Sequence, residues 1–187
     1  MKLRLFIALN LPEDLKKKIN YEVNQLRPLF KFPIRFSAKE NWHITLTFLG
    51  YEPEEAIAGI MAAMKKTAAD FKPLTVQFEN LSYGPKDTSS VRMIWLNGTK
   101  ETSRALAALK ASLEDNLIDN QVNFKGENRP FETHLTLARF EPQPRRNLTP
   151  LAKPFNHQFE AKGLDLMQSH LQRSGAEYEL LTKFEFK

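Results

Sequence analysis

One pattern of chemically active residues occurs twice in this sequence. Residues 43–46 read His-Ile-Thr-Leu, and residues 134–137 read His-Leu-Thr-Leu. From the residue composition, chance alone gives roughly 0.03 copies of His-x-Thr-Leu in a chain of this length. The repetition therefore marks a candidate site that contains two histidines and two threonines.

The spacing within each copy predicts that His and Thr act together on one ligand. Both segments alternate polar and apolar residues as strands do, and residues two apart on a strand project from one face about 7 Å apart. An imidazole titrates near pH 6.5, so one histidine can accept a proton while the other donates one. Threonine hydroxyls can donate hydrogen bonds to phosphate oxygens. The two pairs therefore predict acid–base chemistry at a phosphorus atom.

The paired histidines also have other interpretations. Either one could be a structural histidine whose nitrogens bond to the backbone or to water. Two together could ligate Zn²⁺, although no Cys, no His-x-His and no carboxylate at ligand spacing supports a metal site. The pairs could also hold a phosphate without chemistry. His157 and His170 lack a threonine partner, so we interpret them as structural or exposed.

Composition and charge exclude several classes of protein. The chain contains no Cys, which excludes disulfides, cysteine-ligated metals and a thiol nucleophile and agrees with a cytoplasmic location. No run of about 18 apolar residues is present to span a bilayer, so we expect no membrane association. The net charge of +5 favours anionic partners such as nucleic acid. The serine-hydrolase elbow and the glycine-rich phosphate loops are absent.

Apolar periodicity predicts two similar halves. The expected strands cover residues 3–9, 34–36, 42–49, 74–78, 91–96, 155–166 and 178–186, and the expected helices cover residues 12–27, 54–71 and 100–117. The chain runs 38 residues from Leu5 to His43 and 40 residues from Ile94 to His134. This nearly equal spacing of strand, helix and histidine strand indicates an internal duplication.

These elements predict an α+β fold with two pseudo-symmetric lobes. Each lobe would contain a mostly antiparallel sheet with helices on its outer face. Residues 1–187 would form a single domain of two intertwined lobes. The strands that carry His43 and His134 would then face each other across a central cleft, which would hold the active site.

Several further motifs give the sequence a resemblance to a known family. They are residues 4–9 (RLFIAL), the surroundings of His43 in residues 41–50 (NWHITLTFLG), residues 129–131 (RPF) before the second histidine, and the closing Ser169-x-Leu171 and Gly175-x-x-Tyr178. Over essentially its whole length the chain resembles the 2H phosphoesterase superfamily. Within that superfamily it is similar to the RNA 2′,3′-cyclic phosphodiesterases once called 2′-5′ RNA ligases.

This resemblance implies a reaction and a role for each site residue. The reaction would be hydrolysis of a terminal 2′,3′-cyclic phosphate to a 2′-phosphate, without a metal or another cofactor. The partners would be RNA ends or cyclic nucleotides that carry a 2′,3′-cyclic phosphate, and we expect a monomer. By position, His43 would be the general acid and His134 the general base, while Thr45, Thr136 and Arg139 would bind the phosphate. The alternatives are 2′-5′ ligation of cleaved RNA (tRNA) halves, and binding of RNA ends without catalysis.

The roles of three further side chains depend on their orientation. Strict alternation turns Arg139 to the strand face opposite His134, unless the strand twists or bulges or the long side chain reaches around. Phe48 and Phe131 could stack on a nucleobase, or they could belong to the hydrophobic core.

Overall fold

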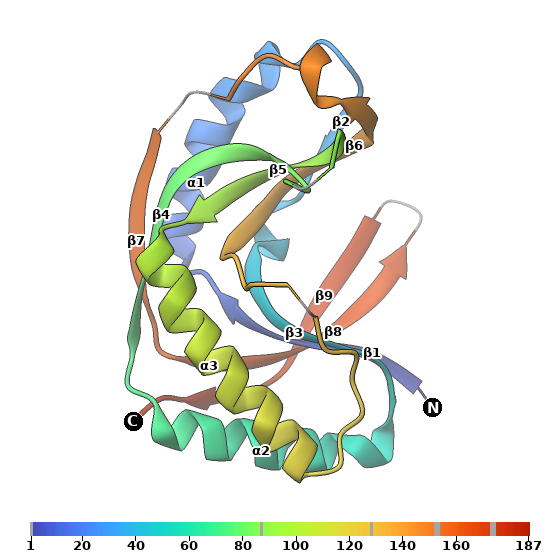
Figure 1. Cartoon of the computed structure of the whole chain (residues 1–187), viewed down its shortest axis with the longest axis vertical. Coiled ribbons are helices and arrows are strands. Elements are labelled where there is room, and N and C mark those ends of the chain that lie inside the picture. The colour runs from blue at the N-terminus through green and yellow to red at the C-terminus, as the bar shows by residue number, and fades with distance from the viewer. Residues whose placement is uncertain (1, 87, 128, 152–153, 173–174) are drawn as a thin grey trace.

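Two antiparallel sheets and three α-helices make up the described part of the chain. The computed structural model describes residues 2–86, 88–127, 129–151, 154–172 and 175–187 (Figure 1). The first sheet has the strand order β3 (His43–Pro53), β1 (Lys2–Asn10), β8 (Gly163–Gln172) and β9 (Gly175–Glu185). The second has the order β2 (Ile34–Phe36), β6 (His134–Pro144), β5 (Ser90–Gly98), β4 (Leu74–Gly84) and β7 (Pro154–Ala161). The α+β fold class predicted from the sequence is confirmed.

The two sheets repeat one arrangement of central strands. In the first sheet β1 lies between β3 and β8, and in the second β5 lies between β6 and β4. His43 begins β3 opposite Asn10 of β1, and His134 begins β6 opposite Asn97 of β5. The equal registers place both histidines at equivalent positions of equivalent strands. The duplication inferred from sequence spacing therefore corresponds to a duplicated strand arrangement.

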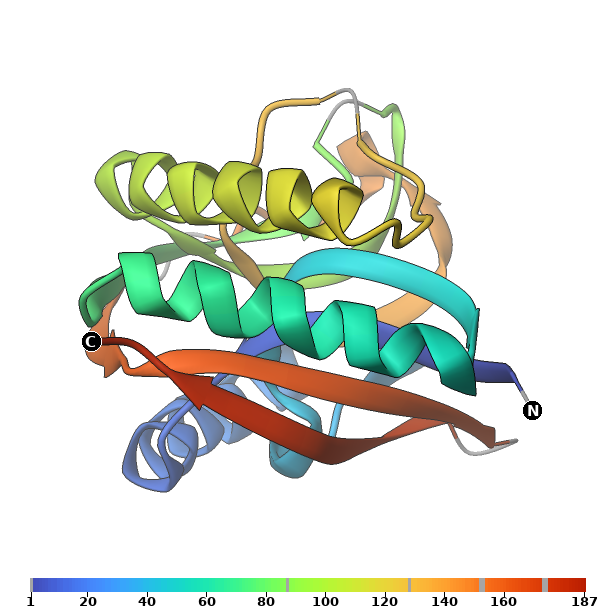
Figure 2. The same cartoon turned by 90° about the horizontal axis from the view of Figure 1, so that it is seen from below.

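The three α-helices are α1 (Glu13–Leu26), α2 (Ile57–Asp70) and α3 (Lys100–Asp119), each with an apolar face against the sheets or another helix. Of these, α1 and α2 follow strands of the first sheet and lead to strands of the second, whereas α3 joins two strands of the second sheet. Thr99 caps α3, since its side chain accepts a hydrogen bond of 3.1 Å from the backbone N–H of Thr102. Figure 2 shows α2 and α3 side by side, although α2 lies against the first sheet and α3 follows a strand of the second. The largest cluster of buried apolar side chains includes residues of both sheets. The division of the chain into one domain of two lobes stays a prediction from the sequence.

The structure differs from the sequence prediction in two strands. β4 continues to Gly84, beyond the predicted end at residue 78. The segment expected as one strand over residues 155–166 contains nearly all of β7 and the start of β8, which belong to different sheets. Gly163 begins β8 at a close backbone contact, because a Cβ there would lie 2.3 Å from the carbonyl oxygen of Phe184. Four short 3₁₀ turns (Arg27–Leu29, Lys39–Asn41, Glu54–Ala56 and Arg145–Asn147) adjoin helices and strands.

In the described residues, no helix combines the length and the apolar composition needed to cross a bilayer.

Candidate active site

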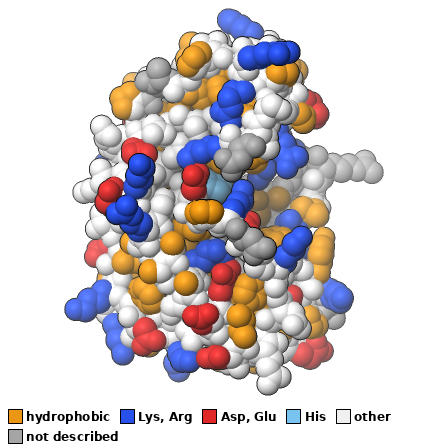
Figure 3. Space-filling model, viewed as in Figure 1, with side chains coloured by type: hydrophobic (Ala, Val, Ile, Leu, Met, Phe, Trp, Pro, Cys, Tyr) orange, Lys and Arg blue, Asp and Glu red, His pale blue; other side chains and the backbone are white. Residues whose placement is uncertain are grey.

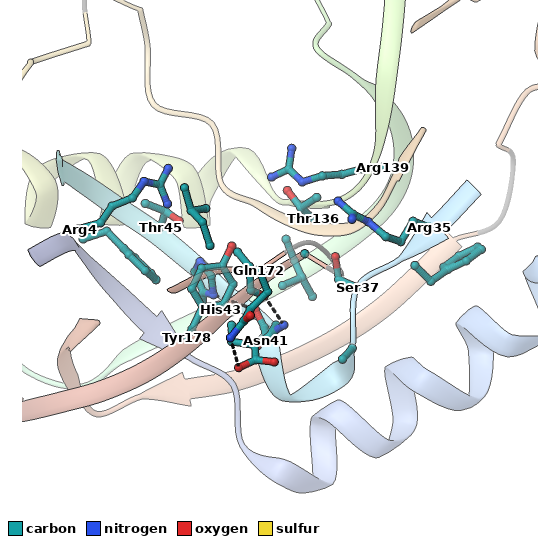
Figure 4. Close-up of a pocket in the computed structure, with 18 of the residues that line it drawn as sticks. Arg4, Arg35, Ser37, Asn41, His43, Thr45, Thr136, Arg139, Gln172 and Tyr178 are labelled. Carbon is teal, nitrogen blue, oxygen red and sulfur yellow. Dashed lines mark hydrogen bonds between the residues drawn. The ribbon is translucent and has the colours of Figure 1, made fainter. Parts of the chain in front are cut away.

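A cavity of about 800 Å³ is lined by residues of both sheets (Figure 4). Six residues that the sequence predicted for the site lie in its lining: His43, Thr45, Phe48, His134, Thr136 and Arg139. Phe131 is not in the lining. It packs partly buried against the main hydrophobic core, so the structure places it outside the cavity where the sequence allowed a stacking role.

Each histidine ring is held by the backbone two residues before it. The Nδ1 atom of His43 lies 2.8 Å from the carbonyl oxygen of Asn41, and Nδ1 of His134 lies 2.8 Å from the carbonyl oxygen of Glu132. A carbonyl can only accept, so Nδ1 carries the hydrogen and donates it. The Nε2 atom of each neutral ring is therefore the nitrogen that can take up a proton.

Aromatic side chains fix the orientation of both rings. The centroid of the His43 ring lies 4.8 Å from the ring of Phe6 and 4.8 Å from that of Tyr178. The centroid of the His134 ring lies 4.2 Å from the ring of Trp95. Asn41 donates a hydrogen bond of 3.0 Å to the carbonyl oxygen of Ala176, which joins the segment before His43 to β9.

Burial lowers the basicity of both histidines. Desolvation lowers the pKa of His43 to about 4, and the positive charges of Lys16 and Arg139 act in the same direction. Desolvation also lowers the pKa of His134. Both imidazoles are therefore neutral near pH 7, and a negative charge in the cavity would raise the pKa of both.

A β-bulge follows the threonine in each strand and decides which side chains reach the cavity. In β3 the register passes from Thr45 opposite Ala8 to Thr47 opposite Ile7, which leaves Leu46 as the extra residue. In β6 it passes from Thr136 to Ala138 opposite consecutive residues of β5, which leaves Leu137 as the extra residue. A bulge reverses the alternation of the residues that follow it.

The two bulges resolve one prediction and correct another. Arg139 lies on the cavity side with His134 and Thr136, as a bulged strand allows. Strict alternation along residues 42–49 predicts Thr47 on the face of His43 and Phe48 on the opposite face. Instead Thr47 is buried with 2% exposure and Phe48 lines the cavity, because the bulge at Leu46 exchanges their faces.

Some cavity residues were not assigned a role from the sequence. Figure 4 shows Arg4 beside Thr45, and Arg139 and Arg35 on the side of Thr136. The guanidinium carbon of Arg4 lies 4.6 Å from the ring centroid of Phe48, and its Nη1 atom donates to Ser169 Oγ at 2.7 Å. Arg4, Asn41 and Tyr178 belong to the motifs behind the family resemblance, which was the available signal. Arg35 and Ser37 lie in a segment that carried no such signal.

A metal centre finds no support in the described residues, where no group of three or more His, Cys, Asp or Glu side chains is arranged to hold an ion. His157 and His170 lie outside the cavity lining. Their Nε2 atoms contact Glu22 at 2.6 Å and Glu179 at 3.0 Å.

Substitution of Gly84 by Ala should disturb the support of His134. A Cβ at Gly84 would lie 2.5 Å from the buried ring of Trp95, which stacks on His134. We expect Gly84→Ala to lower the free energy of unfolding by about 1–3 kcal/mol and to shift the NMR signals of the His134 ring. Urea unfolding and NMR test this. Gly126→Ala is the control, since nothing lies within 4 Å of a Cβ there. Equal effects of both variants would contradict the prediction.

The sequence has characterised relatives of nearly equal length. Residues 9–95 match the sequence model of the family described as LigT like Phosphoesterase. A protein of Thermus thermophilus named RNA 2′,3′-cyclic phosphodiesterase is 29% identical over 99% of this chain and 91% of its own length. A protein of the same name from Bacillus subtilis is 27% identical over 96% of this chain and 94% of its own length.

Solved structures share the fold. A crystal structure of a protein from Thermus thermophilus is similar with a TM-score of 0.78 and 28% identity, over 98% of each chain. The LigT protein of E. coli, solved in complex with 3′-AMP, is similar with a TM-score of 0.79 over 100% of this chain and 99% of its own. Its identity of 23% makes it evidence for the fold alone.

A duplicated α+β fold in which each lobe brings one His-x-Thr pair to a shared cavity defines the class of two-histidine (2H) phosphoesterases. Within that class, the comparisons find this chain similar to the LigT-like phosphoesterases, through the family model over residues 9–95 and through relatives that are 27% and 29% identical over nearly the whole chain. They confirm the resemblance found in the sequence.

Proposed function

We propose that this protein is an RNA 2′,3′-cyclic phosphodiesterase that hydrolyses a terminal 2′,3′-cyclic phosphate to a 2′-phosphate. The observation that carries the proposal is the shared cavity, in which each histidine has Nδ1 bonded to the backbone and Nε2 available, with a threonine two residues away. The names of the relatives support the substrate. Lys and Arg side chains lie close to the histidine visible in Figure 3, together with an acidic side chain, and the net charge of +5 suits an anionic RNA end.

The proposed reaction is an in-line displacement at phosphorus. His134 Nε2 removes a proton from water, and the water oxygen attacks the phosphorus atom. The bond from phosphorus to the ribose 3′ oxygen breaks, and His43 Nε2 donates a proton to that oxygen. The products are a 3′-hydroxyl and a 2′-phosphate. His134 then loses the proton to solvent and His43 regains one.

The remaining polar groups stabilise charge on the phosphoryl oxygens. Thr45 and Thr136 lie two residues after their histidines, so each hydroxyl can donate to one non-bridging oxygen. Arg139 adds a positive charge beside Thr136 (Figure 4). Because His43 is neutral near pH 7, its role as general acid requires that the bound phosphate anion raises its pKa.

Hydrolysis should not need a divalent cation. We expect the rate with adenosine 2′,3′-cyclic phosphate in excess EDTA to stay within about twofold of the untreated rate, since histidines, threonines and an arginine supply proton transfer and charge. A tenfold loss that Mg²⁺ or Zn²⁺ restores would contradict this proposal.

The identity of the product tests the function itself. Chromatography should show 2′-AMP and no 3′-AMP from adenosine 2′,3′-cyclic phosphate. Absence of turnover would contradict the proposed function and favour binding without catalysis. Cleaved tRNA halves offered to the same enzyme test the reverse reaction, in which a 5′-hydroxyl replaces water and a 2′-5′ linkage forms. The cytoplasmic location and the monomeric state stay predictions from the sequence.

A further inference from the structure

We propose that Arg4 binds the phosphate that precedes the terminal cyclic phosphate, so that the enzyme prefers the end of an RNA chain to a single cyclic nucleotide. This inference rests on the proposed function and specifies its substrate class. It comes from the contacts of Arg4 and from a difference between the two lobes.

Arg4 is a positive charge held in place without a negative partner. Its guanidinium group lies over the ring of Phe48 and donates from Nη1 to the buried hydroxyl of Ser169, which is 5% exposed. Among the described residues, no carboxylate lies within salt-bridge distance of Arg4. A guanidinium group has five N–H donors, so most of them are left for a ligand. Planar donors of this kind match a phosphate group.

The lobes differ at the second position after the extra residue of each bulge. In the second lobe this position is Arg139, opposite Met93 of β5, and in the first lobe it is Phe48, opposite Phe6 of β1. Arg4 enters from β1 opposite Tyr51, and its guanidinium carbon lies 4.6 Å from the ring centroid of Phe48. The positive charge of the first lobe therefore lies against the side chain that takes the place of Arg139, and not at that place itself.

This displacement separates two sites for phosphate. Arg139 lies beside Thr136, where it can contact the phosphate that reacts. Arg4 lies instead between Phe48 of β3 and Ser169 of β8, which it contacts. A neighbouring phosphate of the same RNA strand would bind the guanidinium group of Arg4. A cyclic mononucleotide has no second phosphate to bind there.

Apolar surface next to Arg4 suits the nucleoside that this second phosphate joins. Leu171 lines the cavity two residues beyond Ser169 on β8, and its side chain is 65% exposed. Residues two apart on a strand share a face, so Leu171 lies on the same face of β8 as Ser169, which holds Arg4. Phe48 is also 43% exposed. Exposed apolar and aromatic groups beside a cation are the combination that binds single-stranded nucleic acid.

The test compares two substrates that differ by one nucleotide. These are adenosine 2′,3′-cyclic phosphate and the dinucleotide ApA that ends in a 2′,3′-cyclic phosphate. For Arg4→Met, we expect the ratio of kcat/KM for the dinucleotide to that for the mononucleotide to fall about 10- to 100-fold. Arg92→Met is the matched control, because it removes the same charge at a residue that is exposed on β5 and lies outside the cavity lining. The ratio of the two kcat/KM values for Arg92→Met should equal that of the wild type.

Two further measurements separate phosphate binding from a structural effect. For dinucleotide binding, the slope of log Kd against log salt concentration should decrease in magnitude by about 0.7 in Arg4→Met, as expected for one lost contact to a single strand. Ser169→Ala, which removes the anchor and keeps the charge, should lower the substrate ratio in the same direction by a smaller factor.

Several outcomes would overturn the inference. Equal losses of Arg4→Met on both substrates would place Arg4 at the reacting phosphate or in the folding of β1. A wild-type ratio near one, or a ratio that Arg4→Met leaves unchanged, would show that no second phosphate is bound. Failure of the wild type to hydrolyse either substrate would instead contradict the proposed function, and this inference with it.

Discussion

Replacement of either His43 or His134 by Ala is expected to lower kcat for a 2′,3′-cyclic phosphate by about 10²–10⁴-fold, the usual value of one general acid or base step. Both histidines line the same cavity, and each proposed proton transfer needs the Nε2 atom of one of them. The double variant should lose little more than the more damaged single variant, because the two groups act in one event. Single-turnover kinetics measures all three.

His170→Ala is the matched control for the two histidine variants. His170 lies outside the cavity, and its Nε2 atom contacts exposed Glu179 on β9. Its rate should equal that of the wild type. Turnover that survives in the double His43/His134 variant at more than about a tenth of the wild-type rate would contradict two-histidine catalysis.

A sulfur-substituted substrate distinguishes the acid from the base. When sulfur replaces the bridging 3′ oxygen, the leaving group departs as a thiolate and needs no proton. His43→Ala should then regain most of its lost rate relative to the wild type, whereas His134→Ala should not. Rescue of His134→Ala alone would exchange the two proposed roles.

Acid should destabilise the protein through His43. The pKa of His43 is about 4 in the folded protein and about 6.5 in an unfolded chain. Between these values the unfolded chain binds a proton that the native protein does not, so the free energy of unfolding decreases as the pH falls. The decrease attributable to His43 should reach about 2.5 kcal/mol between pH 7.5 and pH 4.5. Above pH 7.5, His43 should not change the free energy of unfolding with pH.

The variant His43→Gln isolates this contribution, because glutamine keeps a similar volume and does not titrate. Urea unfolding of both proteins across this pH range should show their stability difference changing by about 2.5 kcal/mol in favour of the variant at low pH. The pKa of His134 is lowered as well, and that of Asp165 is raised by burial, which acts with the opposite sign. Because His134 and Asp165 are present in both proteins, their contributions cancel in the stability difference. Parallel stability curves would contradict the lowered pKa of His43.

Much of the fold was predictable because its signals are local. Alternation identified the two histidine strands, and the short strand over residues 34–36 was found with its observed bounds. Equal spacing in the two halves revealed the duplication, since equivalent strands and helices have similar lengths. The division of residues 155–166 between two sheets was missed, because apolar content alone does not indicate which sheet a strand joins.

The features of the candidate site also divide into those that the sequence predicts and those that depend on the tertiary structure. The twin motif by itself determined the two histidines, the two threonines and the expected chemistry at phosphorus, because these depend on residue types at fixed spacing. Only the tertiary structure decided that Arg139 and Phe48 enter the cavity and that Thr47 does not, since bulges arise from pairing with a neighbouring strand. The lowered pKa of His43 and the support of Arg4 by Phe48 and Ser169 are also tertiary, because burial and contacts between distant strands exist only after the two lobes pack together.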